Sequence, residues 1–251
     1  MIFRPTNPVS HRLARLALLL ACGAAVIVAV AGPLHRYLGL DREIALGVFR
    51  YGFYLAAAAI ALGLATLGPT RPGDRRRGFL AAVLALIVGV GAAWAPLSWL
   101  MVAYRAPSLN DISTDTENPP KLVVTGQMRQ GATNAPTYPG ESAATLQHTV
   151  YPDLTPIRLG VPVDEAFRRA DRVAVAMGWT IVARAPTDGR IEAVATSPWF
   201  GFQDDISIRV RPDGPSASRV DIRSKSRTGA SDLGVNAERI RAFAKRLLAE
   251  R

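Results

Sequence analysis

The acidic pair Asp204 and Asp205 has the residue types of an acid/base catalyst. Two carboxylates can serve as general acid and general base when both reach one substrate. The pair stands, however, at the start of an alternating run, and adjacent residues of a strand point to opposite faces of a sheet. We therefore expect the two carboxylates to diverge. A bend, or a charge partner for nearby arginines, is the better interpretation.

Basic side chains alternate along the two runs that follow. Arg209 and Arg211 belong to the first run, and Arg223, Lys225 and Arg227 belong to the second. A period of two places the cations of each run on one face of a sheet, opposite an apolar set. Two interpretations remain open. The cations form a shallow surface for an anionic lipid headgroup, envelope polymer or partner, or they form a solvated face joined by ion pairs.

The register of this hairpin bears on the choice. If Arg211 lies opposite Arg219, then opposite charges face each other at two further positions. These positions pair Arg209 with Asp221 and Asp205 with Lys225. Opposite charges across a strand pair stabilise a sheet by roughly 0.2–1 kcal/mol. The pattern therefore favours ion pairs over an open anion-binding surface.

Ser231, Asp232 and His148 supply the residue types of a hydrolytic triad. No G-x-S-x-G pattern surrounds the serine, and nothing in the sequence places the three side chains together. Ser231 and Asp232 precede an apolar periodic segment, where such residues cap a helix. Asn236 stands near the start of the same segment. Because asparagine is a weak helix former, its position points to a hydrogen bond with a loop or a ligand.

Metal and cofactor signatures are missing from the sequence. Asp111, Asp115 and Glu117 form an acidic cluster. A calcium loop needs tighter alternate spacing and a glycine at its bend, which this stretch lacks. Asx-type turns are therefore the better interpretation of the cluster. Cys22 is the only cysteine, which excludes an intrachain disulfide and a cysteine zinc site. No phosphate-cradling glycine loop, HExxH pattern or nucleotide fingerprint occurs. We expect no metal and no cofactor.

Helical and alternating periods assign these residues to a small α+β domain. Apolar residues at helical spacing predict one helix over Val163–Met177 and another from about Leu233 to Glu250. Strands are expected at Trp179–Arg184, Arg190–Thr196 and on both sides of the turn within Ser197–Arg227. Short connections favour a two-layer fold of helix, four antiparallel strands and helix, with both helices on one face. The other face would be polar or covered by the preceding segment.

Three long uncharged runs precede this domain. They are Leu16–Leu34, Tyr51–Thr70 and Gly78–Tyr104. A helix of about 20 apolar residues crosses a hydrocarbon core of roughly 30 Å. Helices buried in soluble proteins are rarely apolar over such a length. The sequence therefore predicts three transmembrane helices.

The net charge of +10 is distributed as membrane topology requires, not as nucleic-acid binding requires. Residues 1–105 hold +8 of it, and residues 106–251 are close to neutral at +2. Basic residues flank the first run and fill the loop at 71–77, which places the N-terminus in the cytoplasm by the positive-inside rule. Three crossings leave the C-terminal domain outside. A cleavable signal peptide ending at Ala29–Ala31 is a competing interpretation that would leave it on the same side.

Composition divides the chain into three parts. Residues 1–105 form a membrane domain, residues 106–160 a proline-rich linker, and residues 161–251 the soluble α+β domain. The linker has little periodicity and is expected to be extended and largely irregular. It either lies partly on the domain or spaces it from the bilayer.

Several motifs, in order, resemble those of the domain of unknown function 1499 family. They are LNDISTDTENPP, GRIEA, WFGFQDD, SRVDIRSKSR and GASDLGVNAERIRAF, and they cover roughly Asn110 to Leu248. The resemblance implies a bacterial protein, often with N-terminal membrane helices, and no established activity, cofactor or substrate. It also implies that the acidic motif is docked on the domain. The matching positions are Asn110, Asp111, Asp115, Asp204, Asp205, Arg223, Ser224, Ser226, Arg227, Ser231, Asp232 and Asn236.

These features predict a multi-pass protein of the bacterial inner membrane with a periplasmic binding or accessory domain of the cell envelope. Expected partners are the lipid bilayer and an envelope protein, lipid headgroup or anionic polymer, and not nucleic acid. The candidate binding residues are Asp111, Asp115, Asp205, Arg209, Arg223, Lys225, Arg227, Ser231, Asp232 and Asn236. The alternative is an envelope-acting hydrolase or transferase with a cluster around Asp205, Arg223 and Ser231. A deep pocket joining these three groups would favour it.

Overall fold

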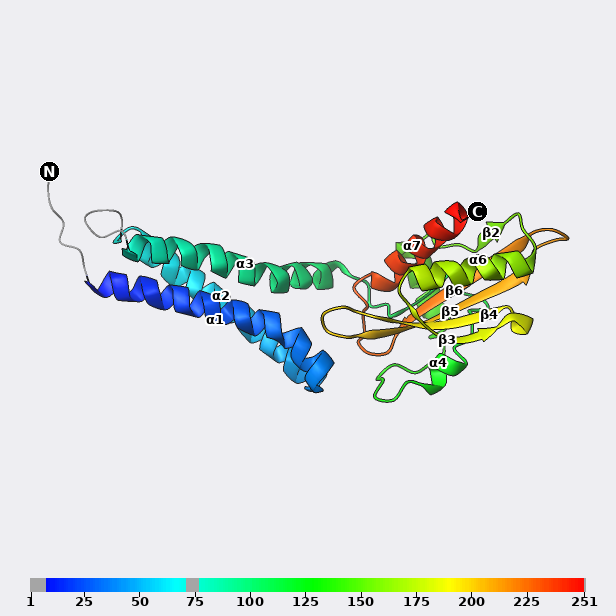
Figure 1. Ribbon diagram of the computed structural model, residues 1–251, viewed down its shortest axis with the longest axis horizontal. Helices are drawn as coiled ribbons and strands as arrows, with labels where there is room; N and C mark the ends of the chain where they lie inside the picture. Colours follow the sequence, from blue (N-terminus) through cyan, green and yellow to red (C-terminus); the bar gives the residue numbers. More distant parts are fainter. Residues whose placement is uncertain (1–7, 71–76, 251) are drawn as a thin grey trace. The chain divides into compact units, whose positions relative to one another are not determined.

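The computed structural model describes residues 8–70 and 77–250 as two compact units (Figure 1). The first unit comprises the described residues up to Tyr104 together with Trp199–Gly201. The second comprises Arg105–Pro198 and the described residues from Phe202 onward. Arg4 and the loop arginines Arg71, Arg75 and Arg76, on which the predicted orientation depends, lie outside the described residues.

The described part of the first unit contains three long apolar helices. These are α1 (Pro8–Leu38), α2 (Arg42–Leu67) and α3 (Arg77–Arg105). All three are long and apolar enough to cross a membrane, which confirms the prediction of three membrane-type helices. The helix α2 begins well before its uncharged run because Asp41 caps it. The Oδ1 atom of Asp41 accepts hydrogen bonds from the backbone N–H groups of Glu43 and Ile44, at 2.8 and 3.2 Å.

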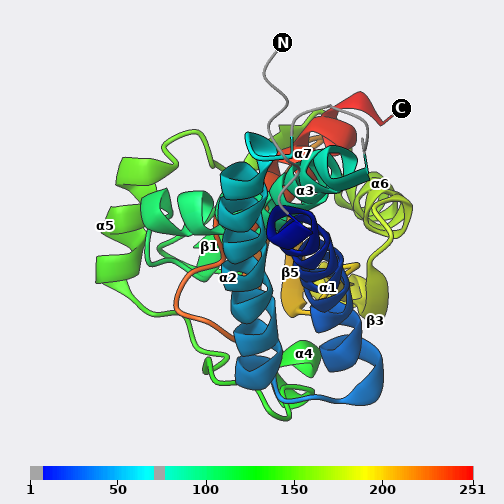
Figure 2. The same ribbon diagram turned by 90° about the vertical axis from the view of Figure 1, so that its left-hand side faces the viewer.

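Small side chains hold the first unit together. The helices α1 and α2 lie side by side (Figure 1 and Figure 2). Alanines fill the contacts among the three helices, and one buried cluster contains Ala17, Ala21, Ala59 and Ala85. Small residues let helix backbones approach closely in a bilayer, where no hydrophobic force drives helices together.

The second unit is built on an antiparallel sheet of six strands within its described residues. The four predicted strands are present as β3 (Thr180–Ala185), β4 (Arg190–Thr196), β5 (Gln203–Pro212) and β6 (Ser218–Ser226). They pair in chain order, which confirms the predicted meander. Arg211 lies opposite Arg219, which is the register on which the expected ion pairs depend. The same register places Arg209 opposite Asp221 and Asp205 opposite Lys225.

The sheet is larger than the sequence predicts, because the proline-rich segment contributes two short strands. These are β1 (Asp111–Ser113) and β2 (Ile157–Leu159), and both pair with the outer edge of β6. The same segment also forms α4 (Val124–Gln127) and α5 (Glu141–Val150). None of these four short elements was predicted, although most residues of the segment are irregular. Strands of three residues are too short to produce a detectable period of two.

Two helices cover one face of the sheet, as predicted (Figure 1). They are α6 (Val163–Ala176) and α7 (Val235–Ala249). Their apolar stripes meet the inward side chains of the strands, and the rings of Trp179 and Phe243 stack at 5.7 Å between centroids. This side of the sheet is called the helix face below.

The opposite face is polar and lies under the proline-rich segment. It is called the polar face below and carries Glu192, Asp205, Ser207, Arg209, Asp221, Arg223 and Lys225. In Figure 1, α4 lies on this side of the strands. The fully buried carboxylate of Glu192 accepts backbone N–H bonds from Val123, Val124 and Thr125 at 2.9–3.1 Å. It thereby satisfies the first donors of α4 and fixes this segment on the sheet.

Candidate functional site

Asp111 on β1 joins the proline-rich segment to two cations of β6. Arg223 forms a bidentate salt bridge with Asp111, with Nε–Oδ1 and Nη2–Oδ2 distances of 2.9 and 2.8 Å. Lys225 Nζ lies 2.7 Å from Asp111 Oδ2. The three side chains are no more than 4% exposed. Removing one partner of a buried ion pair typically costs about 3–5 kcal/mol, because the other charge stays buried. These residues therefore hold the fold and are not free to form an open basic surface.

The remaining donors of these cations hold the chain that follows. Arg223 donates to the carbonyl oxygens of Pro120 and Pro136 at 3.2 and 2.9 Å, and its guanidinium lies 5.5 Å from the ring centroid of Tyr138. Burial lowers the pKa of Lys225, against the raising effect of Asp111. Burial and the charge of Asp111 raise the pKa of Tyr138 to about 12. Tyr138 belongs to this group although it lies in a segment without a helical or alternating period.

Asp205 is the centre of a second buried ion pair. Its carboxylate is fully buried and accepts hydrogen bonds from Arg129 and from Arg227, whose Nη2 lies 2.8 Å from Oδ1. Arg129 also donates to the carbonyl of Ser226 at 3.1 Å. Burial lowers the pKa of Arg129, and the charge of Asp205 opposes this. Arg129 could not be recognised from the sequence, because it comes from an aperiodic segment and contacts Asp205 only through long-range folding.

Three arginines share two carboxylates at the far end of the polar face. The Nη2 atoms of Arg209, Arg211 and Arg219 lie 2.8–3.2 Å from Asp115 Oδ2. All three guanidinium groups also bind the buried Asp221 at 2.9 Å. This cluster is a charge network of the kind the register predicts, with Asp115 added from the proline-rich segment. Because it holds three positive and two negative groups, it keeps one positive charge.

A separate polar group lies on the helix face. Asp204 Oδ2 accepts from Arg239 Nη2 at 2.6 Å, so Asp204 and Asp205 point to opposite faces, as the alternation predicts. The fully buried Asn236 accepts from Ser224 Oγ at 2.7 Å and donates to Ser226 Oγ at 3.0 Å. This group ties β6 to the start of α7 and satisfies the buried amide, as buried polar groups require.

Asp232 anchors the first turn of the C-terminal helix, which begins slightly later than predicted. Its carboxylate accepts from the backbone N–H groups of Gly234 and Asn236, at 2.8 and 3.0 Å. Burial raises the pKa of Asp232, while these two hydrogen bonds lower it. The Asp232 side chain therefore caps the helix by hydrogen bonding, as expected from the sequence. The residue at the N-cap position itself is Gly234.

The structure does not bring the triad residue types together. Ser231 Oγ donates to the carbonyl of Pro107 at 2.8 Å and accepts from the backbone of Leu233 at 3.2 Å. His148 Nε2 lies 2.8 Å from Thr116 Oγ1 at an exposed position. Within the described residues, no group of three His, Cys, Asp or Glu side chains is placed to hold a metal ion. The predicted site residues therefore divide between the polar face and the helix face.

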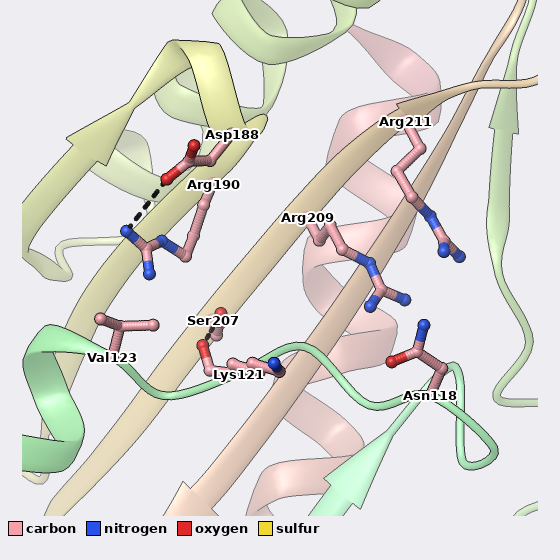
Figure 3. Close-up of a pocket in the computed structure, with 8 residues that line it drawn as sticks. All are labelled: Asn118, Lys121, Val123, Asp188, Arg190, Ser207, Arg209 and Arg211. Atoms are coloured by element: carbon pink, nitrogen blue, oxygen red, sulfur yellow. Dashed lines mark hydrogen bonds and ion pairs between the residues drawn. The ribbon is translucent and has the colours of Figure 1, made fainter.

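A cavity of about 360 Å³ opens beside the polar face (Figure 3). It is called the cationic cavity below and is lined by Asn118, Lys121, Val123, Asp188, Arg190, Ser207, Arg209 and Arg211. Arg209 is the only one of these eight among the predicted site residues. Neither Lys121 nor Arg190 was predicted as a site residue. Lys121 lies in the aperiodic segment, and Arg190 lies opposite Arg209 only because β4 pairs with β5.

Comparison with known proteins agrees with the motif resemblance. A family model described as "Protein of unknown function (DUF1499)" matches residues 111–247. The match covers more than half of the 251 residues and includes both faces of the sheet described above. No curated protein matches the chain. The matched range contains most of the sheet unit, and this chain belongs to the DUF1499 family.

Proposed function

We propose that this chain is a multi-pass protein of the bacterial inner membrane whose sheet unit serves, on the periplasmic side, as a binding or accessory module of the cell envelope. One observation carries the binding function. Most predicted site residues are engaged in internal ion pairs, whereas the lining of the cationic cavity includes Lys121, an exposed cation without an ion pair among the described residues. Concave sites with a few convergent polar groups are where ligands bind.

The charge of the cavity wall indicates an anionic partner. Lys121, Arg190, Arg209 and Arg211 face Asp188 as the one carboxylate in the lining. Lys121 is exposed and has no ion-pair partner within the described residues. Phosphate-rich and carboxylate-rich polymers, and anionic lipid headgroups, are the chemistry that such a wall attracts.

The sidedness rests on topology. Three helices that each cross a bilayer would leave the two ends of the chain on opposite sides of it, and the basic excess before position 106 favours a cytoplasmic N-terminus. In a Cys22→Ala background, a membrane-impermeant maleimide should label Lys245→Cys in spheroplasts. It should label Arg12→Cys only after detergent is added. Labelling of Arg12→Cys alone in intact spheroplasts would reverse the proposed orientation.

The binding function is tested by crosslinking in native membranes. A partner that uses the cationic cavity should be recovered with the wild type, lost with Lys121→Glu and retained with Lys245→Glu. Both substitutions reverse one exposed lysine, so the total charge change is matched. Equal recovery with both variants would exclude the cavity as the contact.

The alternative of a hydrolase or transferase receives no comparable support. Asp205 pairs with arginines on the polar face, Arg223 pairs with Asp111, and Ser231 bonds to backbone groups. A nucleophile needs a base within hydrogen-bond reach, and these three groups do not share a pocket.

A further inference from the structure

Two arginines lie directly opposite each other at the wall of the cationic cavity. Arg190 on β4 and Arg209 on β5 are register partners. Like charges that face each other across a strand pair destabilise a sheet. Carboxylates of the fold or an external anion can offset this repulsion.

No carboxylate of the described residues bridges this pair. Arg190 lies 3.4 Å from Asp188 and 3.4 Å from Glu192. Arg209 binds instead to Asp115 and Asp221, each at 2.9 Å. The two guanidinium groups therefore have separate counter-ions.

Each arginine of the pair also retains an unused donor. The Nε atoms of Arg190 and Arg209 are buried and have no hydrogen-bond acceptor among the described residues. A buried donor without an acceptor costs about 1–3 kcal/mol. An anion between the two guanidinium groups would offset their like charges.

Lys121 supplies a third cation from the opposite wall. Ser207 holds its backbone in place by donating to the Lys121 carbonyl at 2.9 Å. In Figure 3 the side chains of Lys121, Arg190 and Arg209 come from three different segments around the same cavity. Three donor groups on different sides match a tetrahedral anion better than a carboxylate, whose two oxygens lie in one plane.

We propose that the cationic cavity binds the phosphate group of a phosphomonoester between Arg190 and Arg209, with Lys121 on its third side. The cavity volume of about 360 Å³ leaves room for a small polar group attached to the phosphate. The same chemistry is presented by a soluble sugar or glycerol phosphate and by a phosphomonoester lipid headgroup. This inference rests on the proposed function and names the ligand class of its cavity.

The test is calorimetric titration of the full-length protein in a neutral detergent. The probes are inorganic phosphate, glycerol 3-phosphate, short-chain phosphatidic acid in the same detergent, and acetate. We expect saturable binding of phosphate compounds and at least tenfold weaker binding of acetate. Tighter binding of phosphatidic acid than of glycerol 3-phosphate would identify the ligand as a lipid headgroup. Tighter binding of glycerol 3-phosphate would identify it as a soluble phosphomonoester. Either result supports the proposal.

Two variants and two controls locate the binding. Arg190→Gln and Lys121→Ala should each weaken phosphomonoester binding about 10- to 100-fold, the equivalent of one charge-assisted hydrogen bond. Arg158→Gln and Lys245→Ala remove the same charges at exposed positions outside the cavity and should bind like the wild type. Lys121 has no ion pair to lose, so Lys121→Ala remains informative even if Arg190→Gln does not fold.

Three results would overturn the proposal. They are the lack of binding of every phosphate probe to the wild type, equal affinity for acetate, and equal affinity in Lys121→Ala and Lys245→Ala. The titration uses solubilised protein and does not depend on membrane sidedness. If it fails while crosslinking still depends on Lys121, the binding function stands and only the ligand class is wrong.

Discussion

Arg223 on β6 and Asp111 on β1 form a bidentate salt bridge, with donor–acceptor distances of 2.9 and 2.8 Å. The arginine comes from the central hairpin, and the aspartate comes from a strand of three residues in the proline-rich segment. Because both side chains are buried, neither can leave the other without exposing an unpaired charge to the protein interior. This pair therefore fixes the segment that also forms one wall of the cationic cavity.

Arg223→Ala should strongly destabilise the sheet unit. It leaves Asp111 with Lys225 alone and frees the carbonyl oxygens of Pro120 and Pro136. We expect a loss of about 3–5 kcal/mol in the free energy of unfolding. Thermal unfolding in detergent measures it, and Arg158→Ala, with a side chain that is 78% exposed, should change the midpoint very little. Equal midpoints for the two variants would contradict the buried pair.

Tyr138 should ionise late and make stability depend on alkaline pH. Its pKa is raised from 10.0 to about 12 by burial and by Asp111, so the folded protein keeps a proton that the unfolded chain loses. This contribution is fully present below pH 10 and is lost as the pH rises towards 12. Stability of the wild type should therefore fall across this window more steeply than that of Tyr138→Phe.

The measurement is unfolding by denaturant at several alkaline pH values, together with an ultraviolet titration of the tyrosines. Phenylalanine keeps the ring that faces the Arg223 guanidinium, which lies 5.5 Å from the Tyr138 centroid. The variant therefore removes the titrating hydroxyl and retains the packing. Parallel pH profiles of wild type and variant would show that Tyr138 is not the group responsible.

Asp115→Asn should produce a defect that salt relieves. The change leaves Arg209, Arg211 and Arg219 with Asp221 as their shared carboxylate and adds one net positive charge to the cluster. We expect a loss of about 1–3 kcal/mol. The loss should shrink between roughly 0.05 M and 0.5 M salt, because ions screen repulsion among partly exposed charges.

Thermal midpoints across this salt range provide the measurement. Asp213→Asn is the matched control, because Asp213 is partly exposed and its ion pair with Arg158 is longer, at 3.4 Å. It should show a small, nearly salt-independent change. If Asp115→Asn gains no more from salt than Asp213→Asn, repulsion among the three arginines is not the cause.

Gly189→Ala should disrupt the turn that leads into Arg190. Gly189 has φ of 62°, and a Cβ atom there would lie 2.1 Å from the carbonyl oxygen of Val210. The left-handed conformation and this clash together should cost about 2 kcal/mol or more. Gly160→Ala is the control, because its Cβ meets nothing within 4 Å. Unfolding midpoints compare the two, and similar values would contradict the described turn.

Features that depend on local periods could be predicted from the sequence alone. In a bilayer the backbone N–H and C=O groups of a long uncharged run must bond to each other, and a helix makes all of these bonds within the run. The three apolar helices were therefore predictable. The alternation around the hairpin assigns the charged and the apolar residues to opposite faces, because a slip of one residue would move the charged set onto the apolar helix face. The divergence of Asp204 and Asp205 follows from the same period.

Long-range contacts determine which segment covers the polar face and which of its charged side chains remain exposed. Asp111, Arg129 and Lys121 lie in a segment without periodicity, and their partners are far away in the chain. Whether a basic strand is an exposed surface or a buried network depends on such long-range contacts, which the period of two does not encode. The opposition of Arg190 and Arg209 likewise needs the pairing of β4 with β5, because a charge cluster is a property of the packed sheet and not of either strand.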